Sequence, residues 1–189
     1  MGARKKKKKK EKGPLEKIKS ILRWIFQIMI VIVVAYILVW FWGQSRTNVG
    51  QAMEPALSGG DRVLLDTVSY HFGGPKRGDI ICFKPNGNEN AQSLIRRVIG
   101  LPGETIQILD GVIYINGRIY MEKESFPTIQ SSGIAQEEIV LGDSEYFVLG
   151  DNRNNSEDSR SADIGNVRLE DIEGKVWFVI APRSHFGWI

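Results

Sequence analysis

A single uncharged stretch near the N-terminus limits what this chain can fold into. Residues 24–42 read WIFQIMIVIVVAYILVWFW, with no charged residue and one polar interruption at Gln27. As a helix, a run of this length spans about 28 Å, which matches the hydrocarbon core of a bilayer. Tryptophans lie at both ends, where their rings favour the membrane–water interface. The sequence therefore predicts a transmembrane helix over residues 24–43 that contacts the lipid bilayer.

The uneven distribution of charge predicts how this helix is oriented. Residues 1–23 contain eleven Lys or Arg against two Glu, a charge of +9, whereas the whole chain carries +3, which leaves −6 for residues 24–189. By the positive-inside rule the basic tail is cytoplasmic. We expect a single-pass protein of the cell membrane, with a cytoplasmic tail over 1–23 and an extracytoplasmic domain over 44–189. An acidic folded part argues against a nucleic-acid partner, which requires a basic face.

Cysteine and histidine are too few for a disulfide framework or a metal centre. The chain has one cysteine and two histidines, and they form no Cys/His cluster. Cys82 lies in an apolar run, where a thiol usually packs as a small hydrophobe. We expect Cys82 to be buried, and we expect neither a metal nor another cofactor.

From residue 44 onward, short β-prone runs alternate with turn residues. Asp110-Gly111 and Asn116-Gly117 are typical of two-residue hairpin turns. The stretch 121–143 is more polar and less periodic, and it is either a small inserted subdomain or a long loop. The pattern predicts a mostly antiparallel β domain. The expected strands are Arg62–Leu65, Asp79–Phe83, Leu94–Gly100, Thr105–Leu109, Val112–Ile115, Tyr146–Leu149 and Lys175–Ile180.

Three motifs in this domain contain residues suited to a hydrolytic site. Residues 50–57 read GQAMEPAL, residues 95–104 read IRRVIGLPGE, and residues 150–160 read GDNRNNSEDSR. In combination they resemble the type I signal peptidases, the membrane-anchored serine proteases that remove signal peptides from exported preproteins. The resemblance covers roughly residues 20–185. It implies the signal-peptidase-type antiparallel β domain, anchored by one N-terminal transmembrane helix.

The resemblance places the two catalytic groups of that family at Ala52 and Arg96. In the family, the first position holds the nucleophilic serine and the second holds the lysine that acts as general base. Alanine has only a methyl group and cannot attack a carbonyl. A guanidinium stays protonated and cannot accept the proton. No other serine stands in a comparable turn with a paired base, so we expect this sequence to be catalytically inactive.

The supporting positions of the family site are kept. By resemblance, Ser156 orients the base, and Asp158 and Arg160 form a supporting ion pair. The implied partners are the signal peptides of secreted preproteins, recognised at Ala-X-Ala sites. The substrate-binding loop contains Gly50, Gln51, Met53 and Pro55.

The sequence leaves several functions open. The chain is a natural pseudoenzyme that keeps a peptide groove, or an active signal peptidase in which Ser→Ala and Lys→Arg replacements were engineered. The intact motif positions around Ala52 and Arg96 favour the second interpretation. Dyad-lacking relatives in Gram-positive bacteria suggest a non-catalytic assembly or chaperone-like partner for secreted or pilus proteins. The short basic tail and single anchor of this chain resemble the Gram-positive form of the family. A plain membrane-anchored β scaffold is the fourth interpretation.

Overall fold

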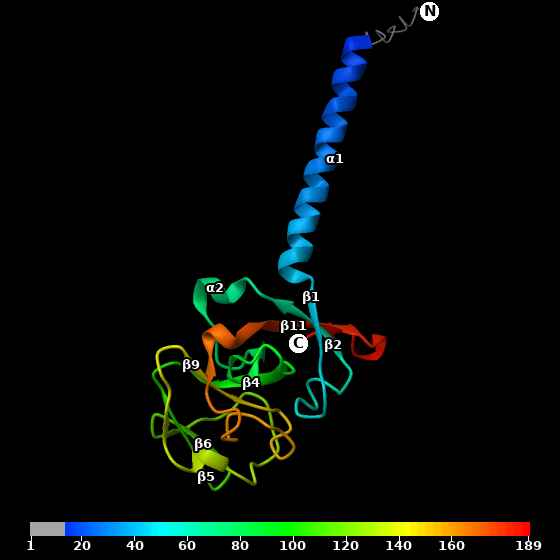
Figure 1. The fold of residues 1–189 in the computed structure, drawn as a ribbon. Coiled ribbons are helices and arrows are strands. Elements are labelled where there is room, and N and C mark those ends of the chain that lie inside the picture. Colours follow the sequence, from blue (N-terminus) through cyan, green and yellow to red (C-terminus); the bar gives the residue numbers. More distant parts are fainter. Residues whose placement is uncertain (1–13) are drawn as a thin grey trace, which may run out of the picture. The chain divides into compact units, whose positions relative to one another are not determined.

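The N-terminal helix is longer than the predicted membrane span. A computed structural model describes residues 14–189, which divide into two compact units, one ending at Trp40 and one formed by Phe41–Ile189. The helix α1 (Pro14–Trp42) is continuous (Figure 1). Pro14 suits the first helical position because the first turn needs no N–H there. Within the described chain, α1 alone is long and apolar enough, over Pro14–Ile37, to cross a membrane.

An antiparallel sheet of eight strands forms the larger part of the second unit. The strand order is β1-β2-β11-β3-β4-β9-β10, and β12 pairs with β11. The expectation of a mostly antiparallel β fold is therefore confirmed. The strands of this sheet are β1 (Gln44–Thr47), β2 (Arg62–Asp66), β3 (Ile80–Phe83), β4 (Leu94–Gly100), β9 (Glu145–Leu149), β10 (Val167–Arg168), β11 (Ile172–Ala181) and β12 (Gly187–Trp188).

A smaller sheet has the order β7-β6-β5-β8. Its strands are β5 (Thr105–Leu109), β6 (Val112–Ile115), β7 (Arg118–Ile119) and β8 (Ile139–Val140). Both predicted hairpin turns are present, with positive φ at Asp110 (50°), Gly111 (79°), Asn116 (52°) and Gly117 (71°). Such turns need positive φ at both central residues, which Asp-Gly and Asn-Gly adopt readily. Between β7 and β8, residues 121–138 contain one short 3-10 turn, η2 (Gly133–Gln136).

Short helical turns connect several strands. The sequence shows no helical period after the membrane segment, but the structure contains α2 (Ser69–Gly73). Five residues are too few to display a 3.6-residue period, which is why the pattern missed this helix. The remaining turns are η1 (Pro85–Gly87), η3 (Leu169–Asp171) and η4 (Arg183–His185).

Strand β4 contributes to all three hydrophobic clusters of the domain. Ile99 packs in the cluster of the smaller sheet, Ile95 packs with Met53 and Leu57, and Val98 packs in the third cluster. Cys82 is fully buried in the cluster of Ile95, as predicted. Because β4 is anchored on several sides, the two arginines in its middle have fixed positions.

Candidate active site

The loop that carries Ala52 is fixed against the segment that follows β9. Gly50 has a φ of 79°, Ala52 is 7% exposed, and Met53 is fully buried. The backbone N–H of Asn152 donates to the carbonyl of Ala52 (3.0 Å), and its side-chain amide donates to the carbonyl of Gln51 (3.2 Å). These bonds join the loop to residues 150–160 without help from a side chain at position 52.

Gly150 permits a close approach of the two segments. A Cβ added at Gly150 would lie 2.6 Å from the carbonyl oxygen of Ala52, and closer still to Oγ of Ser156. Real side chains do not tolerate such distances, so only glycine fits here without movement of the backbone. Ala52, Gly150 and Ser156 therefore meet at one place, although a hundred residues of sequence separate the first from the other two.

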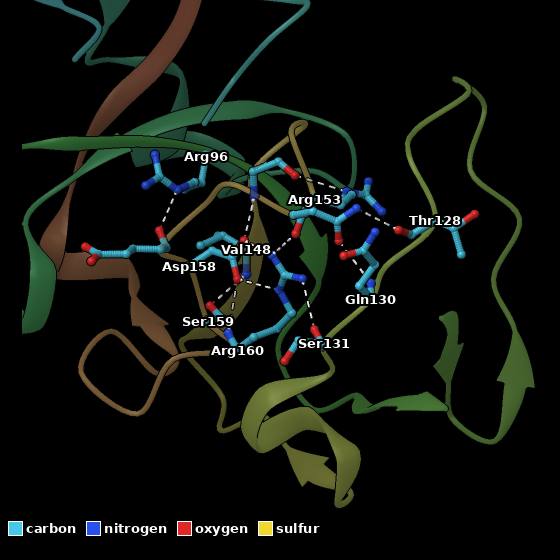
Figure 2. Close-up of polar contacts among 12 residues, drawn as sticks. Arg96, Thr128, Gln130, Ser131, Val148, Arg153, Asp158, Ser159 and Arg160 are labelled. Atoms are coloured by element: carbon cyan, nitrogen blue, oxygen red, sulfur yellow. Dashed lines mark hydrogen bonds and ion pairs between the residues drawn. The ribbon is translucent and has the colours of Figure 1, made fainter. Parts of the chain in front are cut away.

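Asp158 is the buried charged centre of this segment. Arg160 donates from Nε to Oδ1 and from Nη2 to Oδ2, both at 2.8 Å (Figure 2). The backbone N–H of Gly150 also donates to Oδ2 (3.0 Å). The ion pair that the resemblance implies is thus present, and it ties residues 158–160 to the end of β9.

Arg96 lies inside the site. The residue is only 4% exposed; its Nε donates to the carbonyl of Glu157 (2.7 Å; Figure 2), and its Nη1 donates to the carbonyl of Ile95 (2.6 Å). Burial lowers the pKa of Arg96, and the negative charges of Asp158 and Glu157 only partly oppose this shift. The side chain remains a donor to two carbonyls and offers no acceptor for a proton.

Ser156 makes no hydrogen bond to the side chain at position 96. Its Oγ is buried and has no hydrogen-bond partner within residues 14–189. Arg96 bonds instead to the carbonyl of the next residue, Glu157. A lysine ends in one compact ammonium, whereas the guanidinium is a wide planar fork. Here the guanidinium donates to two backbone carbonyls, and the hydroxyl of Ser156 is not among its hydrogen-bond partners.

Two further arginines next to the site were not predicted. Arg97 makes two 2.7 Å bonds to the carboxylate of Asp151, and Arg153 Nη1 donates to Glu122 (2.6 Å). The ring of Phe126 lies 5.4 Å from the Arg97 guanidinium and 4.2 Å from that of Arg153. Burial alone would lower the pKa of Arg97, but the bonds to Asp151 raise it. These contacts fasten the segment after β7 to the site.

Comparison with known proteins agrees with the family that the motifs resemble. The family model described as signal peptidase, peptidase S26, matches residues 21–181. The chain belongs to this signal peptidase family. It is 36% identical to a probable signal peptidase I-1 of Synechocystis sp. over 166 residues, which cover 85% of this chain and 82% of the relative. It is 31% identical to signal peptidase IB of Staphylococcus aureus strain COL over 183 residues, or 89% and 93% of the two chains.

Among solved structures, the chain is similar to a signal peptidase I from Enterococcus faecalis V583. The TM-score is 0.41 at 35% sequence identity, and the match covers 53% of this chain and 95% of that chain. The family assignment rests on the sequence matches, which extend over most of this chain and of both relatives.

Proposed function

We propose that this chain is a type I signal peptidase-like membrane protein that recognises signal peptides at Ala-X-Ala sites and does not cleave them. One observation carries the proposal. Ala52 and Arg96 occupy the two reacting positions, while the residues around them remain packed and bonded as a site. The residues around these positions support recognition of the peptide, whereas alanine and arginine at positions 52 and 96 remove the nucleophile and the base that cleavage needs.

Peptide cleavage by a serine and lysine pair needs a hydroxyl that attacks and an uncharged amine that takes its proton. Ala52 supplies no oxygen, so no acyl-enzyme can form. Arg96 supplies no base, since it stays charged and both of its bonds are donated. In serine proteases, loss of one member of such a unit costs roughly 10⁴- to 10⁶-fold in rate, and a second loss adds little. We expect turnover below detection.

The packing around Ala52 supports recognition without cleavage. Met53 and Leu57 of the loop that carries Ala52 are fully buried, and they pack in one apolar cluster with Ile95 of β4. An extended peptide is recognised when it adds to a strand edge through main-chain bonds, while shallow pockets select its side chains. Loss of the serine hydroxyl leaves this packing in place, because the carbonyl of Ala52 is bonded to the backbone N–H of Asn152.

The proposal also includes the orientation of the chain in the membrane. The helix α1 anchors the chain in the cell membrane, with the basic tail in the cytoplasm and the β domain on the outer face. The exposed apolar side chains of α1 and the charge of +9 over residues 1–23 support this orientation.

To test this proposal, the full chain in detergent is incubated with a preprotein that contains an Ala-X-Ala site, and the cleaved product is measured. The unmodified chain, Ala52→Ser alone and Arg96→Lys alone are expected to yield no product, whereas the double variant Ala52→Ser/Arg96→Lys cleaves. Clear turnover by the unmodified chain would contradict the proposed inactivity. An inactive double variant would show that the residues around Ala52 no longer support catalysis even when the serine and the lysine are restored. Absence of signal-peptide binding to all four chains would overturn recognition and favour an assembly role or a plain scaffold.

A further inference from the structure

Within residues 14–189, the edge of β4 that faces the site has no strand partner at its N-terminal end. β9 pairs with β4 from Arg97 onward, where Arg97 lies opposite Leu149. Near the middle of β4, the N–H of Val98 donates to the carbonyl of Asp79, on the β3 side. Hydrogen-bonding directions alternate along an antiparallel strand. The carbonyl of Ile95, an odd number of residues away, therefore points to the other side, beyond the end of β9.

This carbonyl is occupied by the side chain of the next residue. Arg96 Nη1 donates to the Ile95 carbonyl at 2.6 Å, while Nε donates to the Glu157 carbonyl at 2.7 Å. The guanidinium therefore bonds to β4 on one side of the site and to residues 150–160 on the other. At 4% exposure, Arg96 fills space inside the site and does not extend into solvent.

We propose that Arg96 occupies the unpaired edge of β4, on which an extended signal peptide binds. Its guanidinium bridges the carbonyls of Ile95 and Glu157, and it competes with the peptide for the carbonyl of Ile95. This inference rests on the proposed function, because the competitor is the peptide that the site recognises. A peptide N–H that pairs with Ile95 meets a carbonyl already bonded to a charged donor, and charge-assisted hydrogen bonds are about twice as strong as neutral ones. The unmodified chain thus binds signal peptides weakly. Arginine in place of the family's lysine at position 96 therefore lowers peptide affinity in addition to removing the general base.

The geometry of arginine makes this occupation specific. A guanidinium presents five N–H donors in a fixed fork and can bond two carbonyls at once, whereas a lysine ends in one small ammonium. The unbonded Oγ of Ser156 agrees with this picture, since Arg96 bonds to Glu157 and not to the serine hydroxyl. Arg96 is therefore a residue that sets peptide affinity, and no part of its effect requires turnover.

The test measures peptide affinity of the full chain in detergent micelles. A fluorescent synthetic signal peptide with an Ala-X-Ala site is titrated, and its anisotropy is recorded. Arg96→Met removes the donors and keeps a long side chain, so binding should tighten about tenfold or more. The matched control is Arg77→Met. Arg77 also donates to a carbonyl of β4, that of Ile99, but within the part of β4 that β9 covers. This control should bind as weakly as the unmodified chain.

Arg96→Lys is a second variant that keeps the positive charge and so guards against loss of folding in Arg96→Met. It should tighten binding less than Arg96→Met. In the unmodified chain, the Nη1–H resonance of Arg96, which reports the bond to the Ile95 carbonyl, should resist solvent exchange and lose this protection at saturating peptide. Equal affinities for the unmodified chain and both Arg96 variants would overturn the inference and leave recognition intact. Equal tightening by Arg77→Met would also overturn it. Absence of binding by every variant would overturn recognition together with the inference.

Discussion

Asp158 shows how a single buried carboxylate organises the loop beside the reacting positions. It is 1% exposed and accepts hydrogen bonds from Nε and Nη2 of Arg160 and from the N–H of Gly150. A buried charge is tolerated only when it is paired and its lone pairs are used, and here both conditions hold. The ion pair therefore keeps residues 150–160 in place without any contribution from Ala52 or from a lysine.

We predict that Asp158→Asn destabilises the full chain by about 3 to 5 kcal/mol, because the charge of buried Arg160 loses its partner. Urea unfolding in detergent, followed by tryptophan fluorescence, measures the change. Asp143→Asn is the matched control, since Asp143 lies on an exposed turn. The control should change the unfolding free energy by no more than about 0.5 kcal/mol. Equal stabilities of the two variants would show that the pair contributes little.

At the scale of the residue, the sequence motifs predicted a side-chain contact only where both residues of the pair lie in a motif. Asp158 and Arg160 are two positions apart in one motif, and their pairing followed from the resemblance. Arg153 also lies in that motif, but its partner Glu122 comes from the aperiodic stretch before β8. Nothing local in the sequence marks Glu122, because its contact depends on how distant strands bring the stretch back to the site.

At the scale of the element, β1 is joined to the interior of the sheet by a cluster around Glu173 of β11. Arg46 of β1 makes bonds of 2.8 and 3.2 Å to the Glu173 carboxylate, and the thiol of Cys82 donates to it at 3.1 Å. Burial would raise the pKa of Glu173. Hydrogen bonds from Arg46, Ser93 and Cys82 outweigh burial and lower the pKa from its ordinary 4.5 to about 2.

The lowered pKa of Glu173 predicts an acid-dependent loss of stability. A carboxyl group with a depressed folded-state pKa stabilises the fold above its unfolded-state value, and this contribution is lost as the pH falls toward the folded-state value. Between pH 4.5 and about 2, we expect a loss on the order of 2 kcal/mol, after allowance for screening of the partly exposed Arg46. Urea unfolding at several pH values measures it. Glu173→Gln should remove this step, and an unchanged pH profile in that variant would refute the assignment.

The elements that the sequence predicted correctly are those with local causes. The β5–β6 and β6–β7 hairpins follow from Asp110-Gly111 and Asn116-Gly117, whose backbones adopt positive φ. The pairing of β8 with β5 has no such local signal, since residues 110–138 separate these strands. It is fixed by burial of Leu141 and Ile106 in one cluster, which only the assembled fold provides.

At the scale of the whole molecule, a basic tail, an apolar helix and a β domain follow one another along the chain. Only Gly43 lies between the last residue of α1, Trp42, and the first residue of β1, Gln44. Orientation of the helix thus decides whether the site faces exported proteins or the cytoplasm.

We predict that the β domain is outside and the tail inside, and the single cysteine makes this measurable. Cys82 is fully buried, and burial together with Glu173 raises the pKa of its thiol well above the usual value, so it should not react with a maleimide. The unmodified chain is then the silent control. On intact cells, a membrane-impermeant maleimide should label Ser144→Cys, on an exposed turn, and should not label Ala3→Cys. Permeabilised cells should show both labels. Labelling of Ala3→Cys alone on intact cells would reverse the orientation, place the site in the cytoplasm, and separate it from the exported peptides that it is proposed to bind.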